Sequence, residues 1–172
     1  MRRQKGFSLI ELLIVVAIIL VIAAIAIPSL IRAKISANES SAAASVRQIS
    51  TAQVAYAVSY PVVGYAASLA TLGPGAGNSS CPNTGPTSST ACIVDSVLST
   101  GTKSGYQFLA VGEPGGGTSP NTEFVTSSAP VSYNSTGTKN YCMVTDGVLR
   151  TDPTSAPIAP DVATCSVYPI EQ

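Results

Sequence analysis

The feature that most constrains this chain is a run of 21 residues, 7–27, in which the only charged side chain is Glu11. At a rise of about 1.5 Å per residue, a helix of this length matches the roughly 30 Å hydrocarbon core of a bilayer. A basic segment, 1–6, precedes the run, and Pro28 follows it directly. The carboxylate requires an explanation, because an acidic side chain at the bilayer centre costs roughly 3 kcal/mol.

Two simple explanations of this segment leave parts of it unexplained. A secretory signal has a basic n-region, an apolar h-region of about 7–15 residues and a small-residue cleavage site. The tripeptide Ala-Ile-Ala at 24–26 fits such a site, but the apolar run is longer than a normal h-region and carries Glu11 near its start. A plain single-pass anchor explains the length of the run, but it explains neither Glu11 nor Gly6.

Residues 6–12, Gly-Phe-Ser-Leu-Ile-Glu-Leu, resemble the signature of the type IV pilin and pseudopilin family. In that family a short basic leader ends in glycine, a phenylalanine becomes the mature N-terminus, and a glutamate is the fifth mature residue. Glu11 is fifth when counted from Phe7, and Pro28 falls where the family carries a helix-softening proline. The resemblance implies that a membrane-bound aspartyl prepilin peptidase cleaves after Gly6 and N-methylates Phe7.

A second subunit would give Glu11 a reason to lie in an apolar helix. Cleavage after Gly6 creates an α-amino group on Phe7, which is a cation at the edge of the same helix. If subunits stack with a small axial offset, Glu11 of one helix neutralises the Phe7 amine of its neighbour. Neither charge is tolerable alone in lipid or in a dry filament core, whereas the pair is. The carboxylate would therefore set the stacking register.

The helical pattern continues after Pro28 and becomes amphipathic. Steps of three, four or seven residues relate the apolar positions of one stripe, which are Ile31, Ile35, Ala42, Val46, Ile49, Ala52 and Tyr56. Most polar side chains fall off the stripe, including Glu39, Arg47, Gln48 and Gln53. The sequence predicts one helix over about residues 7–59, softened near Pro28 and ended by the following X-Pro step.

The second half of the chain predicts a small antiparallel sheet. Short helical turns are expected at 65–72 and 92–98, and strands at 106–111 and 122–127. A sheet of three or four strands covered by the helical stripe gives an α+β fold, in which a long N-terminal helical stem packs on a small antiparallel β-sheet head. The predicted parts are a leader (1–6), a transmembrane and assembly helix (7–28), an amphipathic half of the stem (29–60) and a head (61–172).

The clearest hairpin pattern joins 139–145 to 148–151 through Asp146-Gly147. A two-residue Asp-Gly loop favours a type I′ turn. That turn pairs Val144 with Leu149 and Cys142 with Thr151. The expectation is that Val144 and Leu149 cover the helical stripe, with Tyr141 and Met143 on the other face.

All four cysteines follow the apolar segment, and an even number in an exported chain favours disulfides. Three pairings are possible. Cys81–Cys92 and Cys142–Cys165 are preferred, because the members of each pair are close in sequence and bracket a proline-rich loop. A zinc site is disfavoured, since the chain has no histidine and no C-x-x-C pair.

The composition excludes several classes of function. Without histidine there is no Ser-His-Asp triad, and the carboxylates are too widely spaced for a calcium loop. Neither a metal nor another cofactor is expected, and the chain is not expected to be an enzyme. Lysine and arginine are few and scattered, so no nucleic acid is predicted as a partner. A membrane-tethered enzyme or ligand-binding head is the remote alternative, and it would require a polar pocket with a perturbed titratable group.

Together these patterns favour a type IV prepilin, a structural subunit that polymerises through its N-terminal helix into a surface pilus. The alternative is a pseudopilin of a type II secretion system, which shares the N-terminal motif. The resemblance implies several partners: sister subunits, the prepilin peptidase, inner-membrane assembly machinery and, before assembly, the lipid bilayer. It places the precursor in the bacterial inner membrane with its head in the periplasm, and the assembled subunit outside the cell.

Overall fold

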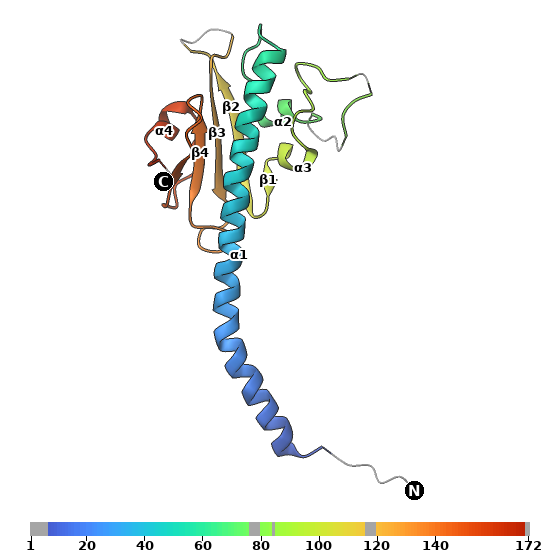
Figure 1. Ribbon diagram of the computed structural model, residues 1–172, viewed down its shortest axis with the longest axis vertical. Helices are drawn as coiled ribbons and strands as arrows, with labels where there is room; N and C mark the ends of the chain where they lie inside the picture. Colours follow the sequence, from blue (N-terminus) through green and yellow to red (C-terminus); the bar gives the residue numbers. More distant parts are fainter. Residues whose placement is uncertain (1–6, 76–79, 84, 116–119, 171–172) are drawn as a thin grey trace. The chain divides into compact units, whose positions relative to one another are not determined.

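The computed structural model of this chain (Figure 1) contains helices and strands joined by loops. It describes residues 7–75, 80–83, 85–115 and 120–170. The predicted leader and Gly6 therefore lie outside the described residues. The chain divides into two units, Met1–Lys34 and Ile35–Gln172. Helix α1, Leu9–Ser59, contributes its N-terminal portion to the first unit and its C-terminal portion to the second.

The first unit consists, in its described part, of the start of α1 and the two residues before it. The helix begins at Leu9, two residues later than the pattern predicts, and it continues through Pro28. No side chain between residues 7 and 34 is buried within the chain. By length and composition the helix is able to cross a bilayer.

In the second unit, the remainder of α1 packs on one face of the β-sheet. Its buried positions are Ala42, Ala43, Ser45, Val46, Ile49, Ser50, Ala52, Gln53 and Tyr56. The predicted stripe is thus confirmed from Ala42 to Tyr56. It is wrong for Ile31, which is 50% exposed, and for Ile35, which is not buried. A helical pattern identifies an apolar face but not how much of that face other parts of the chain cover.

Gln53, expected among the solvated residues, is fully buried. Its side-chain oxygen accepts a hydrogen bond from the backbone N–H of Ala66 at 2.8 Å, and its amide nitrogen donates to the Ala66 carbonyl at 3.1 Å. The Gln53 carboxamide therefore forms hydrogen bonds with both the backbone N–H and the carbonyl of Ala66, a buried residue that does not belong to a strand. This tertiary partner explains why a polar residue belongs to the buried face.

Within the described residues, the sheet has five antiparallel strands in their sequence order, one more than the expected maximum of four. They are β1 (Thr102–Lys103), β2 (Tyr106–Glu113), β3 (Glu123–Pro130), β4 (Asn140–Val144) and β5 (Arg150–Asp152). Strand β1 has two residues, too few to produce an alternating pattern. Short helices also belong to the α+β fold, namely α2 (Leu69–Leu72), α3 (Ser96–Ser99) and α4 (Val162–Ser166).

The two faces of the sheet contribute to two apolar clusters. On the α1 side lie Tyr141, Met143 and Leu149. On the opposite side lie Cys142 and Val144, covered by the C-terminal segment that contains α4 (Figure 1). The expected faces of Val144, Tyr141 and Met143 are therefore wrong, and that of Leu149 is right. Val144 must share a face with Cys142, two residues away, whose disulfide partner lies in the C-terminal segment.

The register of the β4–β5 hairpin also differs from the prediction. Cys142 pairs with Arg150 and Tyr141 with Thr151, whereas a two-residue loop would pair Cys142 with Thr151. The loop is therefore longer than expected, and the last strand is shifted by one residue. A shift of one residue exchanges the faces of all side chains on a strand.

The turn itself explains this difference. A type I′ turn requires positive φ at both central residues, but of Asp146 and Gly147 only Gly147 has a positive φ, 73°. The Gly147 N–H donates to the Val144 carbonyl at 3.0 Å. The Asp146 side chain accepts from the backbone N–H of Val148 at 2.9 Å. A side-chain hydrogen bond thus stabilises a longer loop.

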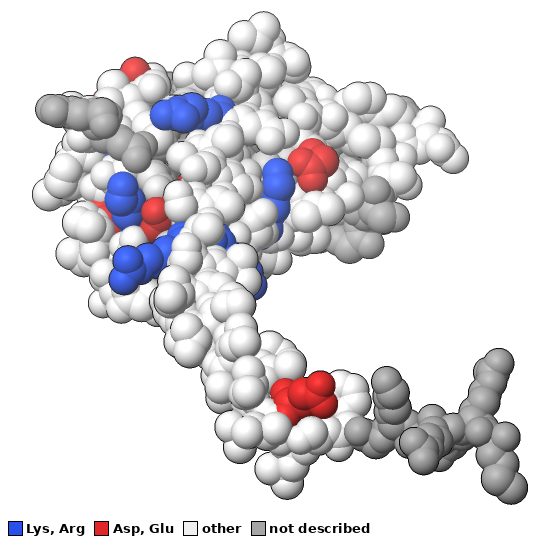
Figure 2. All heavy atoms as spheres, turned by 60° about the horizontal axis from the view of Figure 1, so that its bottom comes forward, with Lys and Arg blue, Asp and Glu red and all other residues white. Residues whose placement is uncertain are grey.

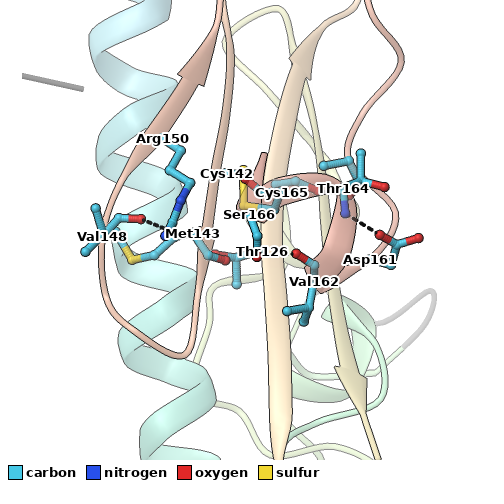
Figure 3. Close-up of a disulfide and its surroundings, with 12 residues drawn as sticks. Thr126, Cys142, Met143, Val148, Arg150, Asp161, Val162, Thr164, Cys165 and Ser166 are labelled. Carbon is cyan, nitrogen blue, oxygen red and sulfur yellow. Dashed lines mark hydrogen bonds between the residues drawn. A yellow bond between two sulfur atoms is a disulfide. The ribbon is translucent and has the colours of Figure 1, made fainter. Parts of the chain in front are cut away.

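The cysteines form the two bonds that the spacing favours, Cys81–Cys92 and Cys142–Cys165, with Cα–Cα distances of 5.9 Å and 5.8 Å. The second bond joins β4 to α4 (Figure 3). Both of its cysteines are fully buried. This bond is therefore part of the second apolar cluster as well as a crosslink of the C-terminal segment.

Candidate assembly site

In the sequence, the residues singled out for processing, Gly6 and Phe7, precede the first residue of α1, Leu9. Gly6 lies outside the described residues, and Phe7, which precedes the helix, is 81% exposed. Leu9, the first helical residue, is exposed to the same extent. Exposed backbone that precedes an element is the kind of segment that proteases cleave.

Glu11 lies in the first turn of α1 and interacts with the end of its own helix. Its Oε2 accepts a hydrogen bond from the backbone N–H of Ser8 at 3.3 Å. The Ser8 carbonyl in turn accepts from the N–H of Leu12 at 3.3 Å. This is the glutamate half of a capping box, in which the third helical residue satisfies the N–H of the N-cap residue. The helix dipole also favours a negative charge at this position.

This role of Glu11 was missed by the sequence reasoning, which gave the carboxylate only an intermolecular partner. The signal that would have found it is Ser-x-x-Glu directly before an apolar run, here Ser8 and Glu11. The donor is a neutral backbone group, and the Glu11 side chain is exposed. A cation from another molecule can therefore reach the carboxylate while the helix remains intact.

The apolar side chains of the first unit line two shallow surface grooves. One, of about 340 Å³, is formed by Leu13, Ile14, Ala17, Ile18, Val21 and Ile22. The other, of about 470 Å³, is formed by Ala26, Ile27, Ser29, Leu30 and Ala33. Contiguous exposed apolar surface of this kind marks a contact with a membrane or with another protein. Its complementary surface would be lipid tails or the apolar side chains of another helix.

Pro28 falls within the span of the second groove, between Ile27 and Ser29. It lies inside α1, and because proline has no backbone N–H, the carbonyl of Ala24 receives no hydrogen bond from it. One turn of the helix is therefore weaker than its neighbours. Glu11, the two grooves and Pro28 all lie on one continuous helix, in the unit that has no other described structural element.

Among the described residues of the second unit, a polar surface pocket of about 360 Å³ is lined by Ser36, Glu39, Ser40, Ala43, Arg47, Lys139 and Tyr141. No group of three or more metal-ligating side chains is found in this part of the chain. Burial raises the pKa of Tyr106, and hydrogen bonds from Arg150 and Thr164 lower the pKa values of Asp146 and Asp161. Asp161 caps α4 and Asp146 belongs to the hairpin loop, so these shifts have local structural causes. Figure 2 shows charged side chains that are sparse and scattered over the face in view.

Comparison with known proteins gives one family match at the same end of the chain and two similar proteins. The family described as "Prokaryotic N-terminal methylation motif" matches residues 1–27. Over 39 residues, 23% of this chain, the sequence is 59% identical to the "Type IV wide pilus major component PilA4" of Thermus thermophilus. Over 54 residues, 31% of this chain, it is 46% identical to the "Type IV major pilin protein PilA" of Myxococcus xanthus.

These matches are confined to part of each protein. The aligned segments cover 30% of the Thermus protein and 24% of the Myxococcus protein, so the chain spans less than a third of either relative. No solved structure matches the chain. The family motif, residues 1–27, contains Phe7 and Glu11.

Proposed function

We propose that this chain, which carries the N-terminal methylation motif of prokaryotic pilins, is the precursor of a type IV pilin. A prepilin peptidase cleaves it after Gly6 and N-methylates Phe7. The mature subunit then polymerises through the N-terminal portion of α1 into a surface filament. The partial similarity to two type IV pilins supports this proposal.

The observation that carries the proposal is an exposed apolar helix with one carboxylate at its start. Each large aliphatic side chain held in water rather than in an apolar environment costs about 1.5–3 kcal/mol. The first unit exposes many such side chains, from Leu9 to Leu30. Lipid tails and the helices of sister subunits both cover them. Transfer from membrane to filament therefore changes the free energy of these side chains little.

Glu11 would fix the axial register between neighbouring subunits, which apolar packing between their helices does not specify by itself. Before assembly its carboxylate accepts only the Ser8 N–H among the described groups. In a stack of processed subunits, the Phe7 ammonium of a neighbour is a stronger partner, because a hydrogen bond between two ionised groups is stronger than one to a neutral donor. Stacking that leaves either charge unpaired in an apolar environment is strongly penalised. A defined axial offset between subunits follows.

The other partners and the location of the chain belong to the same proposal. The precursor is held in the bacterial inner membrane by α1, with its second unit in the periplasm, and inner-membrane machinery assembles it. Two disulfides in the second unit agree with an oxidising compartment. No residue of that unit is proposed to be catalytic.

N-terminal mass analysis of the native protein, combined with electron microscopy of filaments sheared from cells, tests the proposal. Methylated Phe7 at the N-terminus of extracellular filaments is the expected result. If the chain has the same N-terminus but stays in the cell envelope and supports protein secretion, its function is that of a pseudopilin and not of a pilin. A soluble monomer that begins after Ala26 would overturn both functions and leave a secretory signal.

A further inference from the structure

The β4–β5 hairpin contains a chemically unusual dipeptide. Asp146-Gly147 is the single Asp-Gly pair in the sequence, and Asn-Gly does not occur. Glycine has no Cβ to hinder attack of its backbone nitrogen on the preceding side chain. Gly147 is also open to solvent, because a Cβ added there would meet no atom within 4 Å. By composition and access, this bond is the most reactive aspartyl bond of the chain.

The structure nevertheless engages both reacting groups in hydrogen bonds to other partners. Both carboxylate oxygens of Asp146 accept hydrogen bonds from the Arg150 guanidinium, Oδ1 at 3.1 Å. Oδ1 also accepts from the backbone N–H of Val148 at 2.9 Å. The attacking nitrogen, that of Gly147, donates its proton to the Val144 carbonyl at 3.0 Å. Ring closure requires all of these contacts to break.

Arg150 is itself well positioned to hold the carboxylate. Its side chain is 12% exposed, against 40% for Asp146, so the guanidinium is largely fixed by its surroundings. It also donates to the Val148 carbonyl at 3.2 Å (Figure 3). A planar guanidinium that binds both oxygens of a carboxylate restrains its rotation as well as its position.

We propose that the Asp146–Gly147 bond is a modification site for isoaspartate formation, and that Arg150 is the positioning residue that suppresses the reaction. In this reaction the Gly147 nitrogen loses its proton and bonds to Cγ of Asp146, while one carboxyl oxygen leaves as water. The resulting succinimide is hydrolysed at either carbonyl. When water attacks the main-chain carbonyl, the former side-chain carbon remains bonded to Gly147. Water is the only co-reactant, and the net change is an isomerisation.

The modification would damage the chain beyond the loop. It inserts a methylene into the backbone of the loop that leads to β5, whose Arg150 pairs with Cys142 and also forms a bridge to Ile170. Thr151 donates its N–H to the Pro169 carbonyl at 2.8 Å. Strand β5 therefore connects β4 to the C-terminal segment. A displaced β5 weakens its pairing with β4 and its contacts with the C-terminal segment. The Arg150–Asp146 contact therefore preserves the fold of a subunit during prolonged use.

Isoaspartate at position 146 can be measured directly on the full chain in detergent. The protein is incubated for weeks at physiological temperature and pH, and isoaspartate is quantified by peptide mapping and by isoaspartyl methyltransferase labelling. The samples are wild type, wild type unfolded in urea, Arg150→Gln and Arg150→Lys. Arg47→Gln is the matched control, because Arg47 is an exposed arginine of α1. Circular dichroism establishes that each folded sample remains folded.

The expected rate in folded wild type is about tenfold below that of the unfolded chain, because charge-assisted contacts must break first. Arg150→Gln raises the folded rate about tenfold, Arg150→Lys raises it less, and Arg47→Gln leaves it unchanged. Equal rates in folded and unfolded wild type would overturn the proposal. So would a folded Arg150 variant with the wild-type rate. If Arg150→Gln does not fold, the isoaspartate rate of folded Arg150→Lys is compared with that of folded wild type. An unchanged rate in Arg150→Lys would then overturn the proposal.

Discussion

The backbone N–H of Ser8 donates a hydrogen bond to Oε2 of Glu11 at 3.3 Å. Glu11 therefore has two possible partners, its own helix end and the Phe7 amine of a neighbouring subunit. The two roles differ in what they need from the side chain. Capping requires only an acceptor, whereas pairing with an ammonium group in an apolar environment requires a negative charge.

Glu11→Gln separates these roles, because glutamine keeps an acceptor oxygen but loses the charge. We expect Glu11→Gln and Glu11→Val to insert into the membrane normally and both to abolish or scramble filament growth. Cell fractionation measures insertion, and shearing with electron microscopy measures filaments. Ser8→Ala is the matched control, since it retains the backbone donor and should still assemble. Normal filaments from Glu11→Gln would refute the charge-pairing role.

Replacement of Gly6 by a bulky residue should prevent cleavage. Gly6→Leu places a large side chain next to the bond that the peptidase would cut, so uncleaved precursor should accumulate in the membrane. Intact mass measurement of the membrane fraction distinguishes the two forms. Gln4→Leu is the control, because it adds a similar side chain within the leader but leaves Gly6 in place. A mature N-terminus at Phe7 in the Gly6 variant would contradict the proposed cleavage site.

Gln53→Leu should destabilise the second unit. The substitution leaves the buried N–H and carbonyl of Ala66 without partners, and each unsatisfied group costs about 1–3 kcal/mol. Thermal unfolding of the full chain in detergent, followed by near-ultraviolet circular dichroism, should show a clearly lowered midpoint. The same change at the exposed Gln48 should have little effect. Equal midpoints for the two variants would show that the Gln53 contacts contribute nothing.

Removal of the Cys142–Cys165 bond should cost more than removal of Cys81–Cys92. The two bonds close loops with sequence separations of 23 and 11, so the chain-entropy model gives each a stabilisation of about 3 kcal/mol. Only Cys142 and Cys165 are fully buried in an apolar cluster, and truncation there adds a cavity. Double Cys→Ala variants compared by thermal unfolding test the order. The reverse order would show that burial of the bond is unimportant.

The Asp146–Arg150 pair should make stability fall at acid pH. The hydrogen bond from Arg150 lowers the pKa of Asp146 in the folded chain. The pair therefore stabilises the fold above the unfolded pKa of about 3.9, and this contribution is lost as the pH falls through the lower folded value. The effect should be small, because the Asp146 side chain is 40% exposed and solvent screens the pair.

The difference between wild type and Arg150→Gln isolates this contribution. The midpoint of wild type should fall more steeply on acidification through about pH 4 than the midpoint of the variant. Parallel curves would show that Arg150 does not lower the pKa of Asp146 in the folded chain.

Features that depend on neighbours in sequence could be predicted. The apolar run after Phe7, its solitary Glu11 and the amphipathic pattern from Ala42 to Tyr56 are local, and helix α1 follows from them. Strand β2 was recognisable from its composition, and β3 approximately so. The Ser8–Glu11 contact was equally local, and its spacing was available in the sequence.

Two features were decided by tertiary contacts, and a third was decided by hydrogen bonds within the β4–β5 loop. Gln53 is buried because the backbone of Ala66, 13 residues away, needs both of its polar groups. Val144 faces the C-terminal segment because Cys142 on the same face is bonded to Cys165. Strand β5 is shifted because hydrogen bonds to Asp146 stabilise a longer loop than Asp-Gly alone favours. Periodicity specifies which side chains share a face, but only the partner that covers the face determines which way it points.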